Sequence, residues 1–240
     1  MYNKSQFQLN KPSIFAEKVI VENILNGKFP AGSELPNQRK LAIILNVARP
    51  SLREALMRLE RDGWISINHG KPTRVLDIWK EGGLNILRAL IEQGQNISTN
   101  QITELLEVRL VIAPVYAISA INKHPHNVLE LLKKGLNLDD LAGKYAKYDW
   151  EMHYQLTLLS DNFVYPLLLN SFAQFYSEMA KLYYSNTKSR LASKQFHLEL
   201  FNAVKNEQFN LAETIFSNAM SNSIYAWRNM NIETNKGEIS

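Results

Sequence analysis

Apolar residues near the start of the chain recur every three or four positions in three short stretches, the spacing of a helix with one buried face. Residues that begin or end helices bound these stretches, among them Pro12, Gly27 and Gly63. Asn46, between the second and third stretches, tolerates the left-handed conformation that a tight turn requires. The pattern predicts helices over residues 14–25, from Asn37 to Asn46 with Leu41, Ala42, Ile44 and Leu45 facing inward, and from about Arg49 to Asp62.

Two β-prone stretches, Trp64–Ile67 and Thr73–Val75, follow the third predicted helix. Between them lies Asn68-His69-Gly70-Lys71-Pro72, a run of turn-forming residues. This pattern predicts a hairpin with a small, basic tip. Because three helices followed by such a hairpin constitute a winged helix-turn-helix, we expect that fold for residues 1–80.

Beyond residue 84 the hydrophobic pattern is helical almost throughout. Glu81-Gly82-Gly83 precedes it as a natural linker. We therefore expect a mainly α protein, with a linker at residues 81–84 and an all-α bundle of six or seven helices at residues 85–240. The predicted helical segments are residues 84–94, 101–121, 126–134, 137–159, 163–185, 189–206 and 209–230.

Composition narrows the class of protein. The 240 residues are 45% hydrophobic and 21% charged, which is sufficient for a packed core. The absence of cysteine excludes disulfides, thiolate metal sites and cysteine nucleophiles. No apolar run approaches the roughly 20 residues needed to cross a bilayer, and residues 1–6 show no signal-peptide pattern, so we expect a cytoplasmic protein with no membrane partner.

Charge is distributed unevenly along the chain. Residues 1–80 hold 13 Lys and Arg against 7 Asp and Glu, a net charge of +6, whereas the remainder, with 14 against 16, has a net charge of −2. A basic domain attracts nucleic-acid phosphates, although charge alone is equally compatible with a solvated basic face. Arg49, Ser51 and Arg53 lie near the start of the third predicted helix, where a recognition helix contacts base edges, and this favours DNA binding.

An ordered set of motif residues runs through this domain. The set is Phe29-Pro30-Ala31-Gly32-Ser33-Glu34-Leu35-Pro36, Arg39, Leu41-Ala42, Val47, Arg49, Leu52-Arg53-Glu54-Ala55-Leu56, Leu59 and Asp62-Gly63-Trp64. It resembles the winged helix-turn-helix of GntR-type bacterial transcription regulators. A second set, in the wing and the segment beyond it, is Asp62-Gly63-Trp64, Ile67, His69-Gly70-Lys71-Pro72-Thr73, Trp79 and Gly83-Leu84-Asn85-Ile86-Leu87. This set is similar to the FadR subfamily of that family, which regulates fatty acid metabolism.

The resemblance implies roles in DNA binding for seven residues. Four of them, on the second and third helices, would contact phosphates and guanines, and the other three, at the tip of the hairpin, would form the wing contact. Two residues depart from the family pattern, since Ala48 replaces the usual Ser or Thr cap of the recognition helix and Pro50 replaces a polar residue. The implied DNA-binding residues are Arg39, Arg49, Ser51 and Arg53, and then His69, Gly70 and Lys71.

Arg109 stands out in the helical region because apolar residues lie one turn before and one turn after it. A charge on an apolar helix face calls for an internal acid or an anionic ligand. The resemblance favours the ligand, a long-chain acyl-CoA, and implies that Tyr183, Ser223 and Trp227 line the same cavity; packing in the core is the alternative for each. Met220 and Ile232 depart from the subfamily pattern, which has a glycine and a lysine there.

A second constellation is typical of a metal site. Asp149 and His153 are four residues apart on one predicted helix face, and His197 lies on a later helix, an arrangement similar to the metal site of related effector domains. Those domains supply one more histidine, and residues 217–221 contain none. An ordinary Asp–His pair on one helix is the alternative, so we expect no metal and no other cofactor.

The resemblance implies a homodimeric regulator that binds palindromic double-stranded operator DNA and is released when long-chain acyl-CoA binds. It also implies repression of fatty acid degradation genes and activation of unsaturated fatty acid biosynthesis genes. One alternative is a GntR-type regulator that senses a carboxylate metabolite through a bound metal. Another is a helical small-molecule carrier or scaffold with a vestigial DNA domain. The sequence shows no phosphate loop and no nucleophile elbow, so we expect no enzyme activity.

Overall fold

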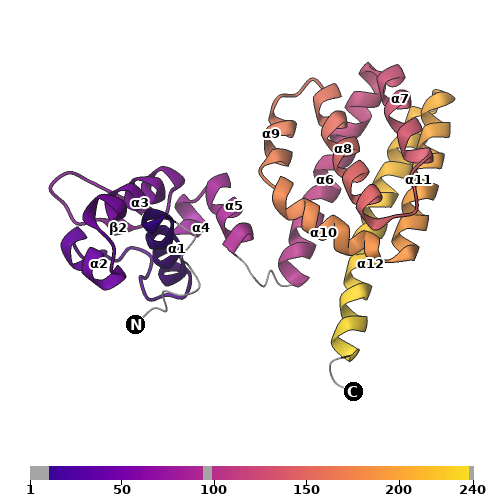
Figure 1. The fold of residues 1–240 in the computed structure, drawn as a ribbon. Coiled ribbons are helices and arrows are strands. Elements are labelled where there is room, and N and C mark those ends of the chain that lie inside the picture. Colours follow the sequence, from indigo (N-terminus) through magenta and orange to yellow (C-terminus); the bar gives the residue numbers. More distant parts are fainter. Residues whose placement is uncertain (1–10, 94–98, 238–240) are drawn as a thin grey trace. The chain divides into compact units, whose positions relative to one another are not determined.

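The computed structural model describes residues 11–93 and 99–237, and it confirms the mainly α fold. This part of the chain holds twelve helices and one two-stranded sheet (Figure 1). The chain divides into two compact units, one ending at Gln93 and the other beginning at Gly94. In the described residues no helix is both long enough and apolar enough to span a membrane.

The first unit contains the predicted helix-turn-helix. Asn46 has a φ of 53°, which is the left-handed turn expected between its second and third helices. Leu41, Leu52 and Leu56 are at most 1% exposed and form the centre of its core. The five helices of this unit are α1 (Pro12–Leu25), α2 (Gln38–Leu45), α3 (Arg49–Asp62), α4 (Ile78–Glu81) and α5 (Leu84–Gln93).

Ile44 differs from the sequence prediction, because its side chain is 53% exposed rather than directed inward. Leu41, Ala42 and Leu45 occupy the buried arc of α2. Ile44 lies outside this arc, since each helical residue advances about 100° around the axis.

The wing is shorter than the sequence pattern predicts. Strands β1 (Ile65–Ser66) and β2 (Arg74–Val75) pair antiparallel, and Glu34 extends the sheet by bridging to Arg74. Gly70, at the tip of the connection, has a φ of 73°, a conformation that glycine adopts without strain. The sheet is therefore anchored to the helices while its tip remains exposed.

Helix α5 belongs to the first unit, although the sequence analysis placed a linker at residues 81–84 and assigned residues from 85 onward to the second domain. Ile86 on α5 is 3% exposed and is part of the same core as Leu56 and Trp64. This burial places the division between units at Gln93 and Gly94 rather than before α5.

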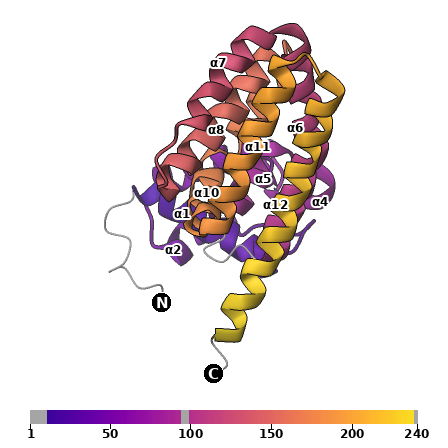
Figure 2. The ribbon, with the colours of Figure 1, turned by 90° about the vertical axis from the view of Figure 1, so that its right-hand side faces the viewer.

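The second unit is a bundle of seven helices, and Figure 2 shows its long helices α6, α11 and α12 running along one another. The stretch predicted as one helix over residues 163–185 is broken at Ser171 and Phe172. The helices are α6 (Thr99–Lys123), α7 (Pro125–Leu136), α8 (Ala142–Leu159), α9 (Val164–Asn170), α10 (Ala173–Ser185), α11 (Thr187–Lys205) and α12 (Phe209–Gly237).

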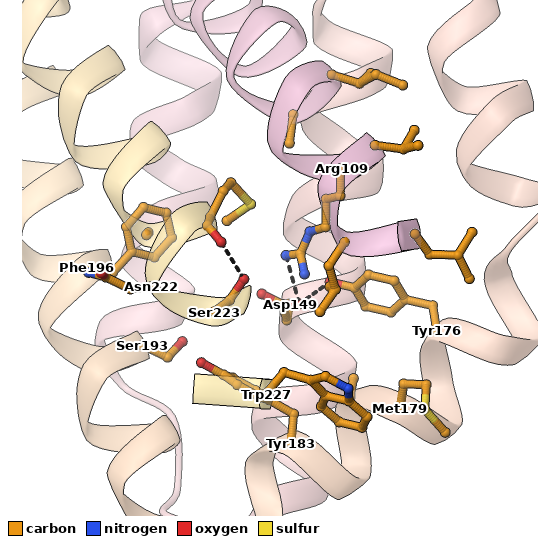
Figure 3. Close-up of a pocket in the computed structure, with 18 of the residues that line it drawn as sticks. Arg109, Asp149, Tyr176, Met179, Tyr183, Ser193, Phe196, Asn222, Ser223 and Trp227 are labelled. Carbon is orange, nitrogen blue, oxygen red and sulfur yellow. Dashed lines mark hydrogen bonds and ion pairs between the residues drawn. The ribbon is translucent and has the colours of Figure 1, made fainter. Parts of the chain in front are cut away.

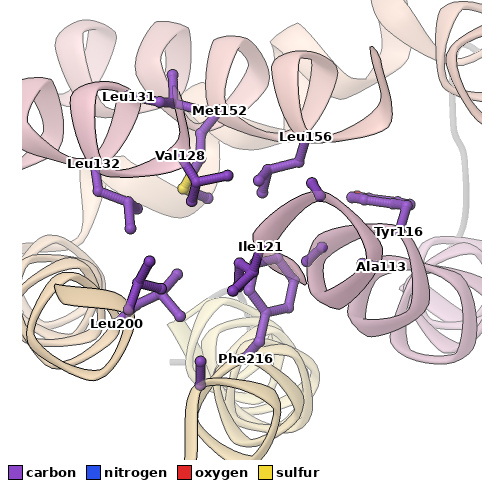
Figure 4. Packing of buried hydrophobic residues seen from close by; sticks show 14 of the residues in the cluster. Ala113, Tyr116, Ile121, Val128, Leu131, Leu132, Met152, Leu156, Leu200 and Phe216 are labelled. Carbon is purple, nitrogen blue, oxygen red and sulfur yellow. The ribbon is translucent and has the colours of Figure 1, made fainter. Parts of the chain in front are cut away.

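The core of the bundle brings five of these helices together (Figure 4). Ala113 on α6, Leu132 on α7, Met152 on α8 and Leu200 on α11 are completely buried, and Phe216 on α12 is 1% exposed. Small residues on the inner face of α6 let neighbouring helices approach closely. This core fixes the helices that carry the cavity described below.

Candidate DNA-binding surface and ligand cavity

The basic surface of the first unit is carried by α2 and α3. Arg39, Arg49 and Arg53 are exposed, Ser51 is half-buried, and within the described residues no ion pair or hydrogen bond engages the three guanidinium groups. These cations are therefore available to phosphates or base edges. Ala48 occupies the N-cap of α3 and makes no side-chain cap, as its sequence position implied.

Two other arginines of α3 are already paired. Arg58 contacts Glu17 at 2.5 Å and Glu54 at 2.7 Å, and Arg61 contacts the neighbouring Asp62 at 2.8 Å. Their charges are thus neutralised locally, whereas those at the start of the helix are not. The structure therefore separates the arginines of α3 into a paired set and an unpaired set.

The tip of the wing is also exposed. His69, Gly70 and Lys71 are all exposed in the connection between β1 and β2. The backbone N–H of Lys71 donates to the carbonyl of Asn68 at 3.1 Å, which closes the turn. The Lys71 ammonium group therefore stands at the tip of a short, well-defined loop.

The second unit encloses a cavity of about 470 Å³ between its helices (Figure 3). Four residues expected to bind a ligand line it, namely Arg109 from α6, Tyr183 from α10, and Ser223 and Trp227 from α12. Most of the other lining side chains are apolar or aromatic. Residues separated by more than 100 positions in the chain therefore converge on one largely apolar space.

Arg109 lies at the centre of a polar cluster in the cavity wall. Its Nη2 donates to Nε2 of His153 at 2.5 Å and lies 3.4 Å from Oδ2 of Asp149. Nδ1 of His153 contacts the hydroxyl of Tyr116 at 2.6 Å, and the hydroxyl of Tyr176 donates to Asp149 (Figure 3). The internal acid that Arg109 requires is therefore Asp149.

Burial and charge set the protonation states of this cluster. Burial, with the Arg109 cation beside it, lowers the pKa of His153 to about 3, so the imidazole is neutral and accepts the Arg109 hydrogen bond. Burial opposes the charge on Asp149, but the Arg109 cation, the hydrogen bond from Tyr176 and the other neighbouring groups together outweigh burial and hold the pKa of Asp149 below its usual value. Burial also opposes the charge on Arg109, but the surrounding acidic groups, with Tyr176 and Asp149 foremost, together outweigh burial and raise the pKa of Arg109.

His197 does not join Asp149 and His153 in one ligand set. It is fully buried, and its Nε2 lies 3.4 Å from the hydroxyl of Ser193. Among the described residues no group of three His, Cys, Asp or Glu side chains is arranged to hold a metal ion. The guanidinium of Arg109 contacts both Asp149 and His153. It therefore occupies the position that a metal ion bound by these two side chains would need.

Comparison with known proteins matches both units to described families. Residues 15–75 match the bacterial regulatory proteins of the gntR family, and residues 76–237 match the FadR C-terminal domain. The fatty acid metabolism regulator protein of Shewanella amazonensis is 35% identical over 219 residues, 91% of each chain. The same-named protein of Pasteurella multocida is 37% identical over 219 residues, again 91% of each chain. The chain belongs to the fatty acid metabolism regulators of the GntR family.

The regulator shares its fold with more distant proteins. A solved structure of Lar, which controls expression of the Listeria monocytogenes agr system, has a TM-score of 0.55 at 14% identity and covers 92% of this chain and 99% of that one. Such a match supports the two-unit architecture alone. Members of the family are DNA-binding transcription regulators and not enzymes.

Sequence analysis missed part of the site in this regulator. Tyr176 was given no role, and Asp149 and His153 were considered as metal ligands or as an ordinary pair on one helix. The sequence showed Arg109 on an apolar helix face, which requires an acid, and Asp149 on another helix, which requires a cation. Joining them required the contact between α6 and α8, which lie 40 residues apart in the chain at Arg109 and Asp149.

Of the two residues that depart from the subfamily pattern, Met220 and Ile232, the structure describes the side chain of the first alone. Met220 is 5% exposed and lines the cavity, so its side chain occupies space that glycine would leave open. The side chain of Ile232 lies outside the part of the chain whose side chains the structure describes.

Proposed function

We propose that this regulator binds a palindromic operator as a homodimer and is released when a long-chain acyl-CoA occupies the cavity of the second unit. In the cell it acts in the cytoplasm, repressing fatty acid degradation genes and activating unsaturated fatty acid biosynthesis genes. The observation that carries the proposal is the convergence of Arg109, Tyr183, Ser223 and Trp227 on one apolar cavity. Relatives of this chain are named as fatty acid metabolism regulators.

The DNA contacts are assigned to the unpaired basic residues of the first unit. Arg49 and Arg53, with Ser51 between them, face the major groove, because exposed side chains at the start of a recognition helix read base edges. Arg39 contacts phosphate from α2. The residues of the wing tip, His69, Gly70 and Lys71, lie along the adjacent groove or strand. A homodimer places one such surface on each half of the proposed palindrome.

The ligand is assigned from the shape and chemistry of the cavity. A largely apolar space of about 470 Å³ suits a hydrocarbon chain, and Arg109 supplies one hydrogen-bonding cation in its wall. For the ligand to release DNA, it must bind one arrangement of the two units more tightly than the other. The regulator that senses a carboxylate through a metal is less well supported, because Arg109 already pairs with Asp149.

Binding of oleoyl-CoA, measured by calorimetry beside coenzyme A alone, tests the assignment of the cavity. Ser223→Leu places a larger side chain in the cavity and should weaken oleoyl-CoA binding by about tenfold or more. The Ser223 hydroxyl donates only to the carbonyl of Met220 in its own helix, so its loss leaves the fold intact.

Ser221→Leu is the matched control. Ser221 is exposed outside the cavity lining, and its hydroxyl makes the equivalent bond to the carbonyl of Ser217. This variant should bind oleoyl-CoA as the wild type does. The cavity assignment fails if Ser223→Leu binds normally, and the acyl-CoA proposal fails if wild-type protein binds coenzyme A as tightly as oleoyl-CoA.

A further inference from the structure

The charges in the cavity wall do not favour a carboxylate beside Arg109. Among the described residues that line it, Arg109 is the one cation, and Asp149 and Glu199 are both acids. Arg109 and Asp149 neutralise each other, and His153 beside them is neutral. A carboxylate entering this wall would therefore meet no uncompensated positive charge.

Arg109 nevertheless has hydrogen-bonding capacity left. The contacts to Asp149 and His153 both use Nη2, and in the described residues Nε and Nη1 have no partner. Its side chain is 20% exposed, and its Cζ lies 5.2 Å from the centre of the Tyr176 ring. The guanidinium is thus fixed in place while N–H donors remain for a ligand.

Asp149 is held in place as firmly as Arg109. Its carboxylate is reached by Arg109 from α6 and accepts the Tyr176 hydroxyl from α10, and its side chain is 9% exposed. Arg109 and Tyr176 both reach the same carboxylate oxygen, Oδ2 (Figure 3). Asp149 therefore cannot turn away to make room for a second carboxylate without losing both partners.

We propose that Asp149 is a specificity-determining residue: by neutralising Arg109, it restricts the cavity to ligands with a neutral carbonyl group, such as an ester or thioester, and excludes a free carboxylate. The inference rests on the proposed function, because it concerns the ligand of that cavity. A neutral carbonyl accepts a hydrogen bond from Arg109 and leaves the pair with Asp149 intact. A carboxylate would be desolvated next to a carboxylate of the same charge.

The first test needs no variant. Wild-type protein is titrated with methyl oleate and with oleate, both below the concentration at which they aggregate, at one pH and one salt concentration. Because the two ligands share a hydrocarbon chain, the comparison isolates the head group. Methyl oleate should bind at least about tenfold more tightly than oleate. Equal affinities, or tighter binding of oleate, overturn the proposal.

Asp149→Asn should remove the preference for methyl oleate. This substitution leaves Arg109 as an uncompensated cation, so oleate should gain at least about tenfold in affinity while methyl oleate changes little. Glu151→Gln is the matched control. This substitution removes the same charge from α8, but Glu151 pairs with Lys134 on the surface, at 2.9 Å. It should leave both affinities unchanged.

A double variant, Arg109→Gln with Asp149→Asn, separates charge from the loss of a side chain. It removes both charges, and the gain for oleate should disappear. If the single variant does not fold, the comparison on wild-type protein still overturns the proposal when oleate binds as tightly as methyl oleate. A wild-type protein that binds methyl oleate but not oleoyl-CoA refutes the proposed function and leaves this inference standing.

Discussion

At Arg109, a charge on an apolar helix face has its counter-ion on another helix, 40 residues further along the chain. Breaking such a pair by removing one partner leaves an uncompensated charge, so the cluster specifies how α6, α8 and α10 meet. Arginines at the start of α3 present the opposite case, since no described acid neutralises them. The first set lines the ligand cavity, and the second forms the proposed DNA contact.

Arg53→Ala should weaken binding to specific operator DNA by about tenfold or more, because an arginine that contacts a guanine contributes about 1–3 kcal/mol. Oleoyl-CoA binding and thermal stability should stay at wild-type values, since Arg53 is exposed. Arg61→Ala is the control, because Arg61 already pairs with Asp62. Wild-type affinity in Arg53→Ala, measured at the same salt concentration, would remove Arg53 from the interface.

The two buried histidines predict how stability depends on pH. Burial lowers the pKa of His153 to about 3 and that of His197 to about 4, whereas an unfolded histidine titrates near 6.5. Below about pH 6.5 the unfolded chain therefore binds protons that the folded chain does not. Stability should fall from about pH 6.5 toward pH 4, by about 1.4 kcal/mol per pH unit for each histidine.

Urea denaturation at several pH values measures this dependence. His197→Gln removes one of the two buried bases, so its free energy of unfolding should change less steeply with pH than that of the wild type. Slopes that are equal in the two proteins would show that His197 is protonated as readily in the folded state as in the unfolded state.

Sequence patterns predict single residues well where the cause is local. The left-handed turn at Asn46 and the missing cap at Ala48 follow from the residue and its neighbours alone. Ile44 could not be placed, because only the packing of α2 decides which edge of an apolar face is covered. The partner of Arg109 likewise depended on a tertiary contact.

Among the elements, the recognition helix is the clearest case of an unmet local preference. Ala48 has an extended conformation at the N-cap of α3 but offers no side-chain acceptor. Helix α2, by contrast, is capped by Asn37, whose side chain accepts from the backbone N–H of Lys40 at 2.9 Å. The two helices of the motif therefore differ in how their first turns are stabilised.

Ala48→Ser should stabilise the first unit by about 1 kcal/mol, because the hydroxyl can accept a free N–H of the first turn of α3. Asn37→Ala should destabilise the same unit by a similar amount. Chemical denaturation monitored in both variants measures these changes. A loss of stability in Ala48→Ser would mean that the cap position is constrained by something other than hydrogen bonding.

Element boundaries were harder to predict than the elements themselves. The helices of the first unit, the wing and most of the bundle follow from periodicity, because their apolar faces are one-sided. The break at Ser171 and Phe172 lies within a run that is apolar on several faces, so no periodicity marks it. Sequence patterns place α5 beyond the linker, because Gly82 and Gly83 resemble a boundary more than Gly94 does, whereas in the structure α5 packs with the first unit.

In the whole molecule, the proposed function is divided between the two units: the first would bind DNA and the second would bind the ligand. Each has its own core, so substitutions in one should leave the other folded. Regulation then depends on the free energy that couples the two sites, which must be the same whether it is measured from the ligand or from the DNA. Arg53→Ala and Ser223→Leu test the sites separately, and the coupling needs its own measurement.

Fluorescence anisotropy of the purified protein on a FadR-type operator duplex tests that coupling most directly. A scrambled duplex is measured beside it at one physiological salt concentration, with and without oleoyl-CoA, because affinity for DNA depends strongly on salt. The account predicts preferential binding to the operator that is lost when oleoyl-CoA is added. Operator binding that is unchanged at saturating oleoyl-CoA would contradict it.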